Sequence, residues 1–282
     1  AEISTRNAIQ LNPNHAEAHS NLGVILKDLG KLQDAEISTR NAIQLNPNYA
    51  EAHSNLGVIL KDLGKLQDAE ISTRNAIQLN PNYAEAHSNL GIILKKLGKL
   101  QDAEISTRNA IRLNPDFTNA YFELSSIELL QGNYQSGLKN YEFRFKIPTP
   151  PLLHGKPSIR KLDDTKLQKE DKLLVVSEQG LGDTLQYMRY IPYLRDQGFD
   201  ISFCAQEKLH RLIKASGIDQ NPLTPEEGNA ISEGQWIPLL SIPKYLNVSQ
   251  DHPIISKPYI HSTDKLIEKW KKILSNEKRP II

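Results

Sequence analysis

The chain has 282 residues, of which 39% are apolar and 24% are charged, and its formal net charge is +1. This size and composition are typical of a soluble chain with room for two domains, and the small net charge argues against nucleic acid or an acidic membrane surface as a partner. A single cysteine, Cys204, excludes an internal disulfide framework and predicts a reducing, cytoplasmic location. No apolar run approaches the roughly 20 residues of a membrane helix, so we expect no membrane span.

A unit of 34 residues is repeated in tandem through the first half of the chain. Residues 16–49 and 50–83 are identical, residues 84–117 differ from them at five positions, and residues 118–146 form a degenerate fourth copy. A constant period without insertions predicts one structural unit stacked on itself. Residues 1–15 match the second half of the unit, so we expect the chain to begin within a repeat and to be a fragment. The two identical copies fit either recent duplication or engineering.

Each unit is predicted to form two helices. In the first copy, apolar residues recur at helical spacing from Ala18 to Leu29, and Gly30 interrupts the series. A second series ends at Asn46-Pro47, because proline cannot continue the helical hydrogen-bond ladder.

The small residues and the proline of this unit resemble the tetratricopeptide repeat. In the first copy the matching positions are Leu22, Gly23, Ala35, Ala42 and Pro47. The unit departs from the family where large aromatic residues are usual, at His19, Leu26 and Thr39. The resemblance implies an α solenoid over residues 1–146, a superhelix that binds a protein or an extended peptide in its groove.

One stripe of the first helix is polar, and we expect it to face this inner groove. Its residues recur at spacings of three and four, and in the first copy they are Glu17, Ser20, Asn21, Val24, Lys27 and Asp28. Asn21, Asn55 and Asn89 form a ladder whose amides offer a donor and an acceptor to a peptide backbone. The segment resembles the superhelix of O-linked N-acetylglucosamine transferases (O-GlcNAc transferases), which implies that these asparagines bind extended peptide. In the alternative interpretation they solvate a helix face or bridge adjacent units.

Other residues recur with the same period. Lys27, Lys61 and Lys95 are predicted to add positive charge to the groove, although a row of lysines also serves solubility alone. His19, His53 and His87 stand at the family's aromatic position and have no second ligand three or four residues away, so we expect packing and no metal site. We expect no nucleic-acid partner, and a homo-oligomer stays open.

The solenoid is predicted to end in an aromatic surface and a linker. The fourth unit carries Tyr141, Phe143 and Phe145, which predict a surface that docks on something. A proline-rich stretch follows, and residues 147–171 are predicted to form a stiff, extended linker.

From residue 172 the pattern predicts an α/β domain with a parallel sheet, covering residues 172–282. Short β-branched or apolar runs predict strands, and amphipathic stretches predict helices. The predicted strands are 172–177, 199–204, 236–240, 258–260 and 280–282, and the predicted helices are 184–195, 207–215 and 263–274. Because the last strand is only beginning where the sequence stops, we expect this domain to be truncated.

A glycine-rich turn follows the first of these strands. Gln179, Gly180, Gly182 and Thr184 lie where a strand passes into a helix, which predicts a loop for an acceptor or an anion. The turn has neither the three-glycine dinucleotide fingerprint nor the lysine of a phosphate-binding loop. Together with residues 177–194 and 236–243, it resembles the first half of a two-Rossmann (GT-B) glycosyltransferase related to the bacterial heptosyltransferases.

This second resemblance implies a chemistry for the longer protein. It implies that Asp183 is a general base on the acceptor hydroxyl, whereas in the alternative interpretation Asp183 caps the helix. It also implies a sugar nucleotide held by a second half that these residues do not contain, so we expect neither a cofactor nor turnover in this fragment. Two functions stay open: an acceptor-recruiting glycosyltransferase, and a scaffold whose α/β domain only docks or dimerises.

Overall fold

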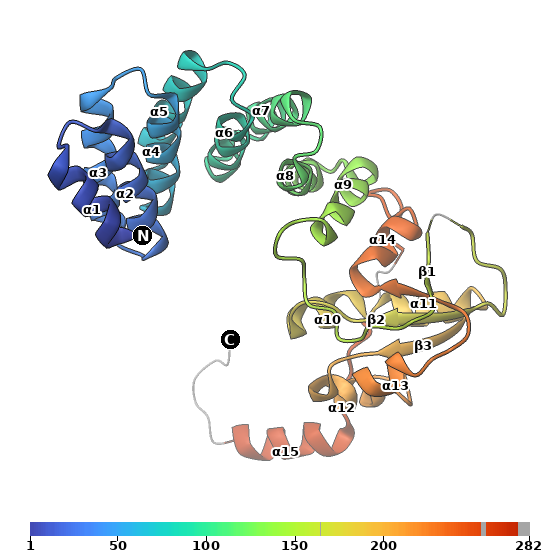
Figure 1. Cartoon of the computed structure of the whole chain (residues 1–282). Coiled ribbons are helices and arrows are strands. Elements are labelled where there is room, and N and C mark those ends of the chain that lie inside the picture. The colour runs from blue at the N-terminus through green and yellow to red at the C-terminus, as the bar shows by residue number, and fades with distance from the viewer. Residues whose placement is uncertain (164, 255–257, 276–282) are drawn as a thin grey trace. The chain divides into compact units, whose positions relative to one another are not determined.

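The computed structural model describes residues 1–163, 165–254 and 258–275 (Figure 1). The chain divides into two compact units, Ala1–Ile147 and Pro148–Ile282. The first unit is entirely helical, and the second has a four-stranded parallel sheet, so the predicted fold class is confirmed.

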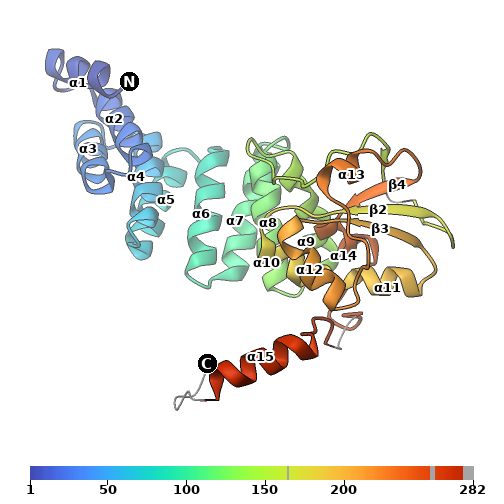
Figure 2. The same ribbon diagram turned by 90° about the horizontal axis from the view of Figure 1, so that it is seen from below.

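The first unit alternates the two helices that the repeat predicts, and Figure 2 shows them following one another in chain order. The first helices of the four units are α2 (Ala16–Asp28), α4 (Ala50–Asp62), α6 (Ala84–Lys96) and α8 (Thr118–Leu130). The second helices are α1 (Glu2–Leu11), α3 (Leu32–Leu45), α5 (Leu66–Leu79), α7 (Leu100–Leu113) and α9 (Tyr134–Tyr141), with the 3₁₀ helix η1 (Glu142–Phe145) after the last.

Glycine and proline set the helix ends. Gly30 has a φ of 74°, a left-handed conformation that glycine adopts without strain. Its amide donates to Lys27 O and the following Lys31 amide donates to Leu26 O, so the last carbonyls of α2 are satisfied. At the other end of the unit, Asn46 closes α3 and its side-chain oxygen accepts the Asn48 amide across Pro47.

Small residues bring the two helices of a unit together. A Cβ atom at Gly57 would lie 2.1 Å from Thr73 Oγ1, so only glycine permits this approach. Thr73 is buried and donates its hydroxyl to Ala69 O. Each unit then shares a core with the next, because Leu56, Leu60 and Ala69 of one unit pack against Ile93 of the following one.

The aromatic residues of the fourth unit pack largely on one another. Tyr121 and Phe143 stack with ring centroids 4.2 Å apart. The rings of Phe122 and Tyr141 are tilted against each other, with centroids 5.8 Å apart. Arg144 is buried, and its guanidinium lies over the rings of Tyr141 and Phe145. These rings therefore have structural partners within the unit, and docking on another partner stays a prediction.

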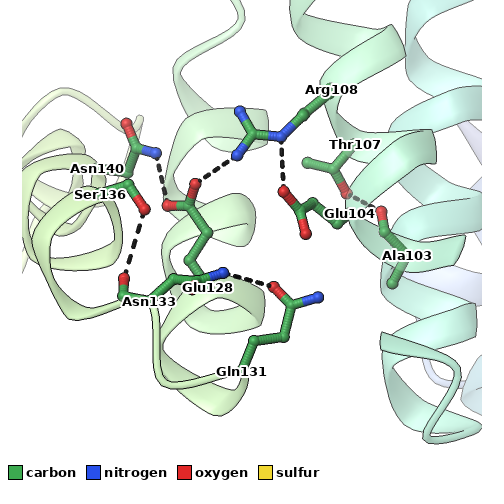
Figure 3. A network of polar contacts seen from close by, with 9 residues as sticks. All are labelled: Ala103, Glu104, Thr107, Arg108, Glu128, Gln131, Asn133, Ser136 and Asn140. Carbon is green, nitrogen blue, oxygen red and sulfur yellow. Dashed lines mark hydrogen bonds and ion pairs between the residues drawn. The ribbon is translucent and has the colours of Figure 1, made fainter. Parts of the chain in front are cut away.

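The fourth unit also contains a buried carboxylate (Figure 3). Glu128 occupies the position of Leu26, Leu60 and Leu94, and it is fully buried. Its two oxygens accept hydrogen bonds from Arg108 on α7 and from Asn140 on α9, both at 2.8 Å. Arg108 also pairs with Glu104 on its own helix.

The second of the two compact units, Pro148–Ile282, alternates short strands and helices, and we call it the α/β unit. Its strands are β1 (Arg160–Lys161), β2 (Lys172–Val176), β3 (Asp200–Cys204) and β4 (Gln235–Pro238). Its helices are α10 (Leu181–Tyr187), α11 (Tyr190–Asp196), α12 (Glu207–Ala215), α13 (Pro225–Asn229), the 3₁₀ helix η2 (Leu239–Ser241), α14 (Ile242–Tyr245) and α15 (Asp264–Leu274).

The strand order is β1-β4-β2-β3, and every pair is parallel. In register, Leu174 lies opposite Ser202 of β3 and Trp236 of β4. The strand β2 is central, and all its residues after Lys172 are buried. In both views α11 and α13 lie on opposite sides of the sheet (Figures 1 and 2), which explains why β2 reads as one continuous apolar run.

The structure differs from the sequence prediction in three places. The predicted linker, 147–171, contributes the edge strand β1, and the Leu162 amide donates to Trp236 O. The predicted helix 184–195 was wrong as one helix: it divides into α10 and α11, because Pro192 cannot donate to the carbonyl of Met188. Residues 258–260 form no strand, and the predicted strand 280–282 lies outside the described residues.

Candidate functional site

The first helices of successive units form the inner surface of the solenoid. They contact one another in the pairs α2–α4, α4–α6 and α6–α8, whereas second helices make no comparable contact with each other. The polar stripe predicted from the sequence runs across these first helices. It is where an extended chain can touch several units at once.

The asparagines of this stripe are oriented by the preceding unit. Asn55 Nδ2 donates to Ser20 Oγ at 3.1 Å, and Asn89 Nδ2 donates to Ser54 Oγ at 3.2 Å. Both serines are buried, whereas both asparagines are half-buried. The bridge fixes the plane of each amide and leaves its Oδ1 without a hydrogen bond among the described residues. The asparagines therefore bridge adjacent units, and they also keep an acceptor for a bound chain.

The ladder changes at its two ends. Asn21 is exposed, and its amide has no hydrogen bond to a serine among the described residues. In the fourth unit Glu123 replaces the asparagine, and Lys95 Nζ contacts Glu123 Oε2 and Ser126 Oγ, both at 2.8 Å. The oriented part of the ladder is therefore Asn55 and Asn89.

The lysines of the stripe are paired with carboxylates. Lys27 and Lys61 each lie 2.9 Å from the aspartate that follows them, Asp28 and Asp62. Together with the pair of Lys95 and Glu123, these contacts offset the positive charge that the sequence predicts for the groove. Whether the lysines also contact a peptide stays a prediction.

The opposite edge of the stripe carries glutamates and aromatic rings, a feature that the sequence analysis did not single out. Glu17, Glu51 and Glu85 lie in the first turns of α2, α4 and α6. Tyr49 and Tyr83 directly precede α4 and α6, and each hydroxyl is close enough to the glutamates of two successive units for their charges to raise its pKa. Burial, then the charges of Glu51 and Glu85, raise the pKa of Tyr83. The signal that reveals this edge is the same 34-residue spacing that revealed the asparagines.

The repeated histidines are structural. His53 Nε2 lies 2.9 Å from Pro47 O, and the same contact joins His19 to Pro13 and His87 to Pro81. Each imidazole therefore joins a first helix to the turn before it. Throughout the described ranges, no three His, Cys, Asp or Glu side chains gather as a metal site would require.

Grooves also lie on the outer surface, between successive second helices. Their volumes are about 490, 450 and 380 Å³ in order along the chain. Arg40, Leu56, Asp68 and Ile71 are among the residues that line the middle groove. These grooves repeat with the unit, and the sequence pattern did not predict them.

In the α/β unit, the glycine-rich loop predicted from the sequence lies at the carboxyl end of β2. Asp183 Oδ2 accepts the Gly180 amide at 3.1 Å, as in the capping interpretation. Thr184 is buried and donates to Gln206 Oε1 at 2.8 Å. Gln179 has a φ of 61°, a left-handed conformation that is uncommon outside glycine. Asp183, Gly180 and Thr184 are thus brought together with Gln179, whereas the space beside Gly182 is open, because an added Cβ there would meet no atom within 4 Å.

Buried polar groups support this loop from the end of β2. Ser177 and Glu178 are both fully buried. Glu178 Oε1 accepts the Leu240 amide at 3.1 Å, which joins the ends of β2 and β4. Ser177 Oγ has no hydrogen-bond partner among the described residues. Buried polar groups and an uncommon backbone conformation together distinguish this edge of the sheet from the rest of the unit.

Comparison with known proteins identifies the repeats. Residues 16–49, 50–83 and 84–117 match the tetratricopeptide repeat family. No curated protein matches the chain in sequence. None of the described helices is both long enough and apolar enough to cross a membrane.

Several solved structures are similar to about half of this chain or less. MamA is 25% identical with a TM-score of 0.45, over 50% of this chain and 83% of that one. A thermophilic TPR protein of Thermus thermophilus is 24% identical with a TM-score of 0.46, over 51% of this chain and 80% of that one. The first TPR of Spaghetti (RPAP3), solved bound to an HSP90 peptide, is 24% identical with a TM-score of 0.40, over 41% of this chain and 92% of that one.

Proposed function

We propose that this tetratricopeptide repeat protein binds an extended peptide segment of a partner along the inner surface of α2, α4 and α6. Its repeats are a protein–protein interaction module. The finer statement, that the asparagine ladder holds the peptide backbone, is our proposal.

The observation that carries it is the orientation of Asn55 and Asn89. An amide anchored through Nδ2 has lost rotational freedom before a ligand arrives, so a new hydrogen bond to Oδ1 costs little further ordering. The acceptors recur once per unit, and a peptide backbone offers donors whatever its side chains. A groove of this kind therefore binds by backbone, with side chains adding selectivity.

The test is a comparison of two double variants. Asn55→Ala/Asn89→Ala removes both acceptors, and we expect binding of a peptide library to fall while circular dichroism stays helical. Ser20→Ala/Ser54→Ala keeps the acceptors but removes their anchors, and we expect a smaller loss. Unchanged binding in the asparagine variant would remove the ladder from the proposal.

We further propose that the second unit is the acceptor-side half of a sugar-nucleotide-dependent glycosyltransferase, with Asp183 as the base and the repeats recruiting its acceptor. Support comes from the glycine-rich loop at the carboxyl edge of a parallel sheet, where ligands of such sheets bind. The uncommon backbone of Gln179 and the buried Ser177 and Glu178 lie at the same edge. We also propose a reducing, cytoplasmic setting, supported by the single buried thiol of Cys204.

The second candidate is a scaffold in which the α/β unit only docks or dimerises. The Asp183–Gly180 contact favours it, because capping already occupies one carboxylate oxygen. Calorimetric titration of the full-length protein with a panel of sugar nucleotides separates the two. Heat with a sugar nucleotide, together with sugar transfer that disappears in an Asp183→Asn variant, supports the enzyme, and no heat with any donor supports the scaffold.

A further inference from the structure

We propose that the inner groove selects a basic partner: an extended peptide that carries a lysine or arginine at about every third residue, directed at the glutamate and tyrosine edge of α4 and α6. This inference rests on the proposed peptide-binding function and names the class of peptide that the groove takes.

The carboxylates of this edge are available for a partner. Glu51 and Glu85 are exposed, and neither forms an ion pair with any described residue. Glu17, one unit earlier, has only a 3.8 Å contact with His15. By contrast, the glutamates of the second helices are engaged: Glu36 pairs with Lys65 and Arg40. The inner edge therefore keeps negative charge that the rest of the unit neutralises.

The lysine edge across the groove opposes this selection at Lys96, which replaces the aspartate of the first two units, is exposed and forms no ion pair with a described residue. The other lysines of this edge are already paired. Lys61 is held by Asp62, and Lys95 is held by Glu123 and Ser126. A partner that pairs with these lysines must displace an existing ion pair, whereas a partner that pairs with Glu51 or Glu85 displaces only water. The groove therefore gains more from a cationic peptide than from an anionic one.

Aromatic rings add a second kind of contact for the same cations. Tyr49 and Tyr83 are half-buried and stand beside the glutamates, and Phe117 occupies the same position before α8. The face of a tyrosine attracts an ammonium or guanidinium group, and a neighbouring carboxylate completes the site with a charge-assisted hydrogen bond. The helices α4 and α6 thus each present one ring and one carboxylate to one basic side chain, whereas Asn119 takes the place of the glutamate on α8.

The spacing of the units sets the spacing of the basic residues. Packed helices are about 8–10 Å apart, so equivalent residues of α4 and α6 recur at about that distance. In a polyproline II peptide, residues on one side recur every third position, at about 9 Å. In a β-strand, residues on one side recur every second position, at about 7 Å, which is shorter than the distance between equivalent residues of α4 and α6. An extended peptide with a triplet period therefore matches the groove.

The test measures binding of labelled twelve-residue peptides by fluorescence anisotropy at low salt. The probes are four triplets of Lys-Pro-Ser, Gln-Pro-Ser or Glu-Pro-Ser, and a peptide of the first composition with its lysines adjacent. We expect the lysine triplet to bind tightest and the glutamate triplet weakest. In the variant Glu51→Gln/Glu85→Gln we expect a loss of about five- to tenfold for the lysine triplet and little change for the glutamine triplet, since two exposed ion pairs are removed.

The matched control is Asp68→Asn/Asp102→Asn. It removes the same charge from the first turns of α5 and α7, which line the outer grooves. Both variants lose first-turn carboxylates, so any loss of helix stability is shared, and only the inner pair is expected to weaken binding. Equal losses in the two variants, or no preference for the lysine triplet, would overturn the inference. If binding of the glutamine triplet still requires Asn55 and Asn89 in that case, the groove binds peptides but does not select basic ones. If none of the peptides binds, the proposed peptide-binding function is refuted as well.

Discussion

Removing Arg108 should cost more stability than removing Arg74, although both arginines occupy the same position of the repeat. Among the described residues Arg74 pairs with Glu70 alone, on its own helix, whereas Arg108 also reaches the buried Glu128 of the next unit. Their side chains are 51% and 53% exposed, so solvent screens both to the same extent. The difference between Arg108→Ala and Arg74→Ala therefore isolates the contact with Glu128.

The magnitude follows from the geometry. Two unit charges about 4 Å apart interact by roughly 4 kcal/mol at an effective dielectric constant of about 20. Because half of Arg108 is in water, we expect about 2 kcal/mol to be lost for that contact, beyond about 0.3–0.5 kcal/mol for the pair within the helix. Asn140 still donates to Glu128 in the variant, which keeps the loss below the roughly 3–5 kcal/mol of a fully stranded buried charge.

The assay is urea unfolding followed by circular dichroism, with hydrogen exchange of α7 and α8 to report local opening. A second background, Glu128→Leu, restores the leucine of the other repeats, and there Arg108→Ala should cost no more than Arg74→Ala. Equal destabilisation by Arg108→Ala and Arg74→Ala in the natural background would refute the reasoning, because Glu128 would then not depend on the guanidinium.

Two further predictions concern packing, one within a repeat and one in the α/β unit. Gly57→Ala should lower the free energy of unfolding by about 1–3 kcal/mol because its Cβ meets Thr73 Oγ1, whereas Gly64→Ala should cost about 1 kcal/mol from backbone strain alone; urea unfolding of both variants checks the order. Burial raises the pKa of the Cys204 thiol to about 11 from an ordinary 9.0. The native thiol should therefore react slowly with a disulfide reagent at about pH 8 and quickly in urea. Its contribution to stability should be lost as the pH rises from 9.0 towards 11, because the unfolded thiol ionises first. The difference between the natural chain and Cys204→Ala isolates that loss, and fast reaction of the native thiol would contradict it.

The repeat was predictable because period, glycine and proline each act locally. Gly30 ends the first helix and Pro47 follows the second, so the helices of a unit could be placed from one copy and carried to the others. The division at Met188 and Arg189 was equally local, and Pro192, four residues after Met188, gave the signal that an amphipathic pattern alone concealed. The edge strand β1 is different, because two exposed residues carry no periodicity and pair only once β4 is in place.

The candidate site was predictable in composition but not in geometry. The spacing placed Asn55 on the inner surface, yet its contact with Ser20 depends on how far one unit is rotated against the next, which no single unit encodes. The same limit applies to Lys61, whose charge is offset by the neighbouring Asp62. Whether a side chain in the groove is available to a ligand depends on which neighbouring side chain it already contacts. The sequence shows both residues but not the contact between them.

The fourth unit shows what distinguishes an end from a middle in a chain of nearly identical units. Where the other units have glycine on the first helix and alanine on the second, it has Ser125 and Gly137, so the small residue that permits close approach has moved to the other helix. A Cβ at Gly137 would lie 2.9 Å from Leu129 Cγ. In the same unit, Glu128 replaces a core leucine and finds its partners in Arg108 and Asn140. An arginine recurs at the position of Arg108 in every full unit, but a buried carboxylate receives it only here among the described residues. The substitutions of the last unit therefore act together and give α8 a contact that the identical repeats cannot make.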